Sequence, residues 1–253
     1  MFKLIKYELR ATFLTIIGIC ATVIIANLLL MTKKGTWELA VPALSIVLFV
    51  GAIIVIFISS LKIMSKYLYD DSGYLLFTLP QSGVSIIGSR LITALIQTTI
   101  VVLVSFLMFY FNVADDISLE FFFKNLKMNL ILYGIFNYIC MIFYSLTIIY
   151  FCMVIGKVAL KGKKIGKIGS FIIFIILSMV IGWISVKITT LFPQNLDLSN
   201  FTINKTAILI NSDFTASGGN FNINIAQTIL DIIIFAGLFI GSSKLIDKKL
   251  DLS

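Results

Sequence analysis

The strongest constraint on this chain is a series of long runs that carry no Asp, Glu, Lys or Arg. A helix of about 20 apolar residues spans the ~30 Å hydrocarbon core of a bilayer. Backbone polar groups in lipid must pair within the segment, so spanning runs of this kind form helices. Five uncharged runs, and a sixth that is interrupted only by Asp231, cover residues 11–32, 39–61, 91–114, 128–156, 168–186 and 222–243. The pattern predicts an all-α membrane protein with six transmembrane helices.

Composition and charge support this class of protein. Of the 253 residues, 59% are hydrophobic and 13% are charged, whereas a soluble domain carries about 25% charged residues. The net charge of +8 would suggest nucleic acid as a partner in a soluble protein. Here the cations gather at the ends of the apolar runs, where they act as topology signals and contact lipid headgroups. We therefore expect the lipid bilayer as a partner and no nucleic acid.

The distribution of Lys and Arg predicts the orientation. If the N-terminus is cytoplasmic, 14 of the 20 basic residues lie inside, as cytoplasmic loops favour. This bias predicts cytoplasmic N- and C-termini and a multi-pass protein of the cell membrane. The inside residues are Lys3, Lys6, Arg10, Lys62, Lys66, Arg90, Lys157, Lys161, Lys163, Lys164, Lys167, Lys244, Lys248 and Lys249.

No internal repeat or soluble domain is evident, so residues 1–253 are expected to form one transmembrane domain. Within it, residues 1–10 are basic on one helical face and apolar on another, which predicts an interfacial helix in the cytoplasmic headgroup layer. Residues 192–221 form a polar extracellular loop rich in Asn, Ser, Thr and Gly, and no structure is assigned to that loop.

The cytoplasmic loop 62–90 carries the most informative motif. Its acidic start can cap a helix, and a proline disfavours helix at the residue before it. The loop is therefore predicted to hold a short exposed apolar helix that needs a partner surface. The residues assigned to it are Asp70, Asp71, Gly73, Tyr74, Leu75, Leu76, Phe77, Leu79 and Pro80.

This motif, followed by Ser82 and by Gly88-Ser89-Arg90-Leu91, resembles the first cytoplasmic loop of type-2 ABC exporter permeases. The resemblance extends to Leu4-Ile5-Lys6-Tyr7-Glu8-Leu9, to the helix count and to the size of the chain. It implies that the short helix is a coupling helix that docks into a groove on a separate ABC ATPase subunit.

The resemblance also implies a bacterial exporter in which two permease subunits, identical or related, pair around a central path. ATP and magnesium would then bind the partner ATPase, and this chain would hold no cofactor. Residues 156–169 are rich in Gly and Lys but do not match the G-x-x-x-x-G-K-[ST] spacing of a phosphate-binding loop. The substrate class implied by the resemblance is an antimicrobial peptide, a lipid or a drug.

Two charges lie at membrane depth, Lys187 and Asp231. An unpaired charge there costs roughly 2.5–3.5 kcal/mol on insertion scales. Pairing of the two between the last helices would relieve this cost, and a role in the substrate path is the alternative.

Two other function classes remain open. A secondary transporter or channel would use acidic residues or broken helices near the midplane, and the chain offers one aspartate there. An intramembrane enzyme would need metal ligands or a catalytic base, but the chain has no His and its three Cys lie in apolar runs without CxxC spacing. We expect no in-chain catalysis and no metal site.

Overall fold

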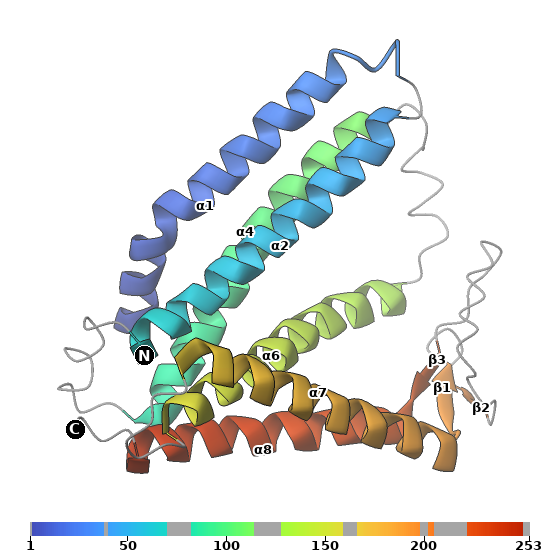
Figure 1. Cartoon of the computed structure of the whole chain (residues 1–253). Helices are drawn as coiled ribbons and strands as arrows, with labels where there is room; N and C mark the ends of the chain where they lie inside the picture. The colour runs from blue at the N-terminus through green and yellow to red at the C-terminus, as the bar shows by residue number, and fades with distance from the viewer. Residues whose placement is uncertain are drawn as a thin grey trace. The chain divides into compact units, whose positions relative to one another are not determined.

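The computed structural model describes residues 2–37, 40–69, 82–113, 128–158, 166–197, 202–204 and 222–249. Within these ranges, six helices are long and apolar enough to cross a membrane, which confirms the predicted number. The helices are α1 (Phe2–Met31), α2 (Ala40–Tyr69), α4 (Gly83–Val113), α6 (Met128–Val158), α7 (Gly166–Leu191) and α8 (Ile225–Lys249) (Figure 1).

The helices extend beyond the uncharged runs that predicted them. Helix α2 continues past Lys62 and Lys66 to Tyr69, and α4 begins at Gly83, before Arg90. Lys and Arg can keep a charged tip in the headgroup layer while their stems lie along the helix. A charge therefore marks the edge of the hydrocarbon core and not the end of the helix.

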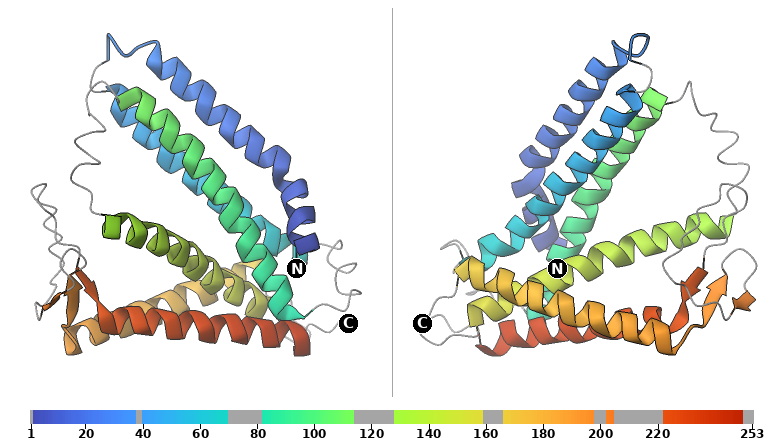
Figure 2. Two further views of the ribbon diagram at one scale, coloured as in Figure 1. Left: turned by 180° about the vertical axis from the view of Figure 1, so that it is seen from behind. Right: turned by 45° about the vertical axis from the view of Figure 1, so that its right-hand side comes forward.

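Residues 1–10 were predicted to form an interfacial helix, but they are not a separate element. Helix α1 runs without interruption from Phe2 to Met31, and its first turns are bent relative to the rest (Figures 1 and 2). No Gly or Pro occurs between Phe2 and Phe13 to break the helix. Ile5 is buried, whereas Phe2 and Tyr7 are exposed.

The chain divides into two compact units. The first contains α1, α2 and α4, which all contact one another. Its core is formed by Ile16 and Val23 of α1, Ala52 and Ile56 of α2, and Val101 of α4. The end of α2 meets the starts of α1 and α4 around Arg90, so successive helices in this unit run antiparallel.

The second unit contains α6, α7 and α8. The end of α6 meets the start of α7 where Gly156 lies against Ser170, and α6 also packs on α8, where Phe151 approaches Gly241. Small residues let transmembrane helices approach closely. Close helix contacts in the second unit therefore lie at glycines, where the absent side chain lets the neighbouring helix approach.

A small antiparallel sheet precedes α8, in the segment where no structure had been assigned. Its strands are β1 (Asn195–Asp197), β2 (Thr202–Asn204) and β3 (Asn222–Asn224), in the order β2-β1-β3. The predicted all-α class is confirmed apart from this small sheet, and the predicted helix start at residue 222 is wrong. The backbone N–H of Gln227 donates to Asn224 Oδ1 at 2.9 Å, so Asn224 caps the helix and α8 begins one residue later.

Large apolar side chains cover the outer faces of both units. Helix α7 is the clearest case, because none of the residues in its most apolar window is buried and Phe171, Met179 and Trp183 are all exposed. Soluble proteins rarely leave contiguous apolar surface of this extent in water. Together with helix length, this surface identifies a multi-pass membrane protein.

The approach of Gly156 to Ser170 predicts an intolerance to larger side chains. A Cβ at position 156 would lie 3.1 Å from the Ser170 Cβ and 3.3 Å from its Cα. Overpacking of this kind costs about 1–3 kcal/mol. We expect Gly156→Ala to lower the melting temperature of the detergent-purified protein. Gly134→Ala, in the same helix with nothing within 4 Å, is the control and should leave it unchanged or raise it.

Candidate functional site

The predicted coupling residues, from Asp70 to Pro80, lie outside the described residues. The structure does describe both flanks of this segment, namely the end of α2 at Tyr69 and the start of α4 at Gly83. The candidate site is the group of polar side chains that lies between these flanks and α1.

Arg90 of α4 is the centre of this group. It is one of the largest fully buried side chains, with 2% of its surface exposed. Its Nε lies 3.3 Å from Glu8 Oε1 of α1 as an ion pair, and its guanidinium lies over the Tyr67 ring of α2, 3.9 Å from the centroid. Nη1 donates to the Ile63 carbonyl oxygen at 3.4 Å. One side chain therefore contacts all three helices of the first unit.

Glu8 has a second partner on α4. Thr93 Oγ1 lies 3.1 Å from Glu8 Oε2 and 2.9 Å from the Ser89 carbonyl oxygen, and its single O–H is shared between these two acceptors. One turn further along α4, Gln97 Nε2 donates to Ser60 Oγ of α2 at 2.8 Å. Arg90, Thr93 and Gln97 follow helical spacing, so they form a polar stripe on the buried face of α4.

The chemistry of this stripe favours a fixed geometry. A buried charge is tolerated only when it is paired and hydrogen-bonded. Arg presents a planar set of donors that can serve several acceptors and can also stack on an aromatic ring. The group of Glu8, Tyr67, Arg90 and Thr93, which we call the Arg90 cluster, thereby fixes the start of α1 against the end of α2 and the start of α4. The last two flank the predicted coupling segment.

A second polar group lies toward the opposite end of the first unit. Asn27 Oδ1 of α1 accepts from Ser45 Oγ of α2 at 2.8 Å and from Asn112 Nδ2 of α4 at 2.7 Å. All three side chains are buried. Hydrogen bonds between transmembrane helices are worth about 0.6–2 kcal/mol each. This Asn27 cluster joins the same three helices as the Arg90 cluster.

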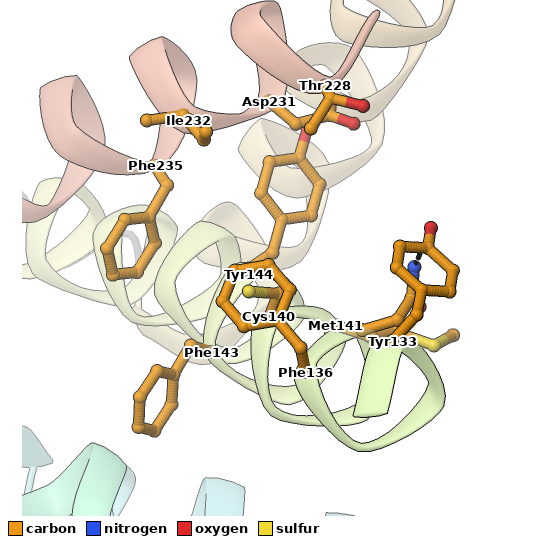
Figure 3. A pocket seen from close by; sticks show the side chains of 11 residues that line it. Tyr133, Phe136, Cys140, Met141, Phe143, Tyr144, Thr228, Asp231, Ile232 and Phe235 are labelled. Carbon is orange, nitrogen blue, oxygen red and sulfur yellow. Dashed lines mark hydrogen bonds between the residues drawn. The ribbon is translucent and has the colours of Figure 1, made fainter. Parts of the chain in front are cut away.

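The two predicted intramembrane charges lie in the second unit, and the structure does not pair them with each other. Gln227 Nε2 donates to Asp231 Oδ1 at 2.9 Å. The Tyr144 hydroxyl of α6 also donates to this carboxylate, and Figure 3 shows the Tyr144 side chain pointing toward Asp231. The Lys187 ammonium instead lies 5.9 Å from the centre of the Trp183 ring. Asp231 and Lys187, both among the described residues, therefore have separate partners and do not form the predicted ion pair.

Sequence reasoning missed the pairing of Glu8 with Arg90. It treated Arg90 as a topology marker and part of a motif, and Glu8 as part of a resemblance. A usable signal was present, because Glu8 is the only acidic residue in α1 and a lone carboxylate beside a spanning segment needs a cationic partner. The identity of that partner depends on which helices pack together.

Comparison with protein-family models, with curated proteins and with solved structures gave no match. No group of three or more His, Cys, Asp or Glu residues that could hold a metal ion occurs in the part of the chain that the structure describes. Cys20, Cys140 and Cys152 are free thiols.

The Arg90 cluster predicts a strong dependence of stability on the ion pair. Arg90→Met should destabilise the protein by about 3–5 kcal/mol, because it leaves the Glu8 carboxylate buried without its cation. Adding Glu8→Gln should recover part of this loss. Unfolding in detergent of the two single variants and the double variant gives the coupling energy. Arg10→Met, which removes an exposed cation of α1, is the control. Additive losses from the two substitutions would contradict the pairing.

Proposed function

We propose that this chain is the membrane-spanning permease subunit of an ATP-driven exporter in a bacterial cell membrane, and that a separate ABC ATPase supplies the energy. The six spanning helices provide the membrane domain that such a subunit needs. The motif of residues 70–80 and its resemblance to the coupling loop of type-2 exporter permeases are the basis for proposing this family. In this proposal the chain itself performs no catalysis and holds no cofactor.

The observation that carries the proposal is the place of the Arg90 cluster. The predicted coupling segment connects α2 to α4, and Arg90 ties the end of α2 and the start of α4 to Glu8 of α1. A force on the segment would therefore act on three spanning helices together. Packed helices with fixed polar contacts move as units between discrete arrangements.

The proposed cycle follows from this connection. Two permease subunits pair around a path, and two ATPase subunits dock on the predicted coupling segments. Closure of the ATPases on ATP displaces each segment, and the Arg90 cluster transmits the displacement to α1, α2 and α4. The path then opens on the far side of the membrane.

A secondary transporter is the second candidate, and Asp231 favours it. An acidic residue within a spanning helix is a common element of ion-coupled transport. The two functions differ in one requirement, because a secondary transporter would work in the absence of any ATPase.

Affinity purification in mild detergent tests the proposed partner. A protein with a Walker A sequence should copurify with the tagged chain. Leu76→Asp together with Phe77→Asp should release it while membrane insertion is retained, because two charges would face the apolar groove of the ATPase. Val84→Asp places one charge of the same sign on an exposed site of α4 outside the predicted segment, and should retain the partner. Copurification of the Leu76/Phe77 variant at wild-type level would refute the docking role.

The Arg90 cluster should affect transmission and not docking. Glu8→Gln removes one charge with little change of size. We expect the partner to copurify normally, whereas ATP hydrolysis by the reconstituted complex should fall roughly 5- to 30-fold, as for a loss of about 1–2 kcal/mol of coupling. Lys187→Gln, in the second unit, should leave the rate unchanged. An unaltered rate in the Glu8 variant would exclude this cluster from energy transmission.

A further inference from the structure

A pocket of ≈ 330 Å³ lies between α6 and α8 in the second unit. Figure 3 shows its aromatic side chains, with Phe143 and Phe235 on one side of the view and Tyr133 on the other. Its polar groups include the Asp231 carboxylate and the Tyr144 hydroxyl. A mainly apolar pocket with a few placed polar groups is the usual form of a small-molecule site.

The pocket contains an unbalanced negative charge. The partners that the structure gives Asp231 are the neutral donors Gln227 and Tyr144. Gln227 is itself held by a contact of its Nε2 with Ser185 Oγ at 3.1 Å. The ammonium of Lys187 lies over Trp183 instead. The carboxylate is thus positioned by hydrogen bonds, and its charge is left for a cation from elsewhere.

The rings around the carboxylate suit the same kind of ligand. A cation is attracted to the face of an aromatic ring by about 0.5–2 kcal/mol, more when water is excluded. Phe136, Phe143, Tyr144 and Phe235 all line the pocket. An anion would be repelled by Asp231, and a neutral amphiphile would leave the carboxylate uncompensated in an apolar setting. Charge and lining together select a cation with an apolar body.

We propose that the pocket between α6 and α8 is a binding site for amphiphilic organic cations, with Asp231 as the counter-ion and the surrounding phenyl rings as the apolar contact. As the substrate class of an exporter this assignment rests on the proposed function, whereas the binding itself does not require an ATPase. Peptides or drugs with a cationic group and aromatic or aliphatic bulk belong to this class.

Binding of tetraphenylphosphonium to the purified chain in lipid nanodiscs, without ATPase or ATP, tests the site. Equilibrium dialysis should show saturable binding. Asp231→Asn should weaken the affinity at least about tenfold, which corresponds to about 1.4 kcal/mol, and Asp231→Glu should retain most of it. Lys187→Gln is the control, because it also removes one charge from the second unit. This variant should bind tetraphenylphosphonium as the wild type does.

Two further measurements keep the test decisive if Asp231→Asn reduces folding. Phe235→Leu removes one ring with little loss of apolar volume and should weaken tetraphenylphosphonium binding several-fold. Triphenylphosphine oxide, which has phenyl rings and no net charge, should bind the wild type at least about tenfold more weakly than the cation. Absence of saturable binding, or equal affinity for the cation and the neutral compound, would overturn the proposal.

Other occupants of this pocket would give different results in the same binding experiments. If a neutral lipid fills the pocket, tetraphenylphosphonium and triphenylphosphine oxide displace this lipid with equal affinity. If a second copy of the chain covers it, Asp231→Asn changes the molar mass measured by light scattering and leaves cation binding as it was. Either result contradicts a cation site.

Failure of this inference can be told apart from failure of the proposed function. Saturable binding that depends on Asp231, with no copurifying ATPase, would support the cation site and refute the exporter subunit. A copurifying ATPase that requires Leu76 and Phe77, with no binding of tetraphenylphosphonium, would support the exporter and refute the cation site.

Discussion

The arrangement of the first unit depends on the burial of one guanidinium among three apolar helices. Arg90 is buried, so it requires a carboxylate and additional acceptors at fixed positions. Glu8 and the end of α2 provide them. This requirement explains why the N-terminal residues join α1 as a continuous helix. It also explains why the end of α2 and the start of α4, which flank the predicted coupling segment, lie beside the start of α1.

The two units hold their helices together by different means. The first uses buried polar side chains at both ends, in the Arg90 cluster and the Asn27 cluster, with an aliphatic core between them. The second adds close approach at Gly156 and Gly241 to the hydrogen bonds of Gln227 with Ser185 and of Tyr144 with Asp231. Helices in lipid gain no hydrophobic free energy by associating, so packing and hydrogen bonds must stabilise the association. Polar clusters have preferred discrete geometries, whereas glycine contacts restrict the distance between helix axes.

The number and approximate positions of the spanning helices could be predicted from the sequence, because six apolar runs have few alternatives in a bilayer. The bounds could not, since Lys62, Lys66 and Arg90 continue a helix beyond the charge-free run. The strands at 195–197, 202–204 and 222–224 were missed because three-residue strands carry almost no periodicity. For the candidate site, Arg90 and Asp231 were noticed as residues. Their pairings with Glu8 and Tyr144 were not predicted, because such pairs depend on which helices pack together, and the sequence alone does not specify this packing.

The uninterrupted course of α1 has a mechanical consequence. Glu8 and Asn27 lie on one continuous helix, about 28 Å apart along its axis at a rise of about 1.5 Å per residue, and each anchors a different cluster of the same unit. If this helix pivots about its Glu8 anchor by about 5°, the amide of Asn27 is carried sideways by about 2.5 Å, a displacement comparable to a hydrogen-bond length. Helix α1 can thus act as a lever arm, so that a small rotation at one membrane surface is enough to part the Asn27, Ser45 and Asn112 side chains toward the other.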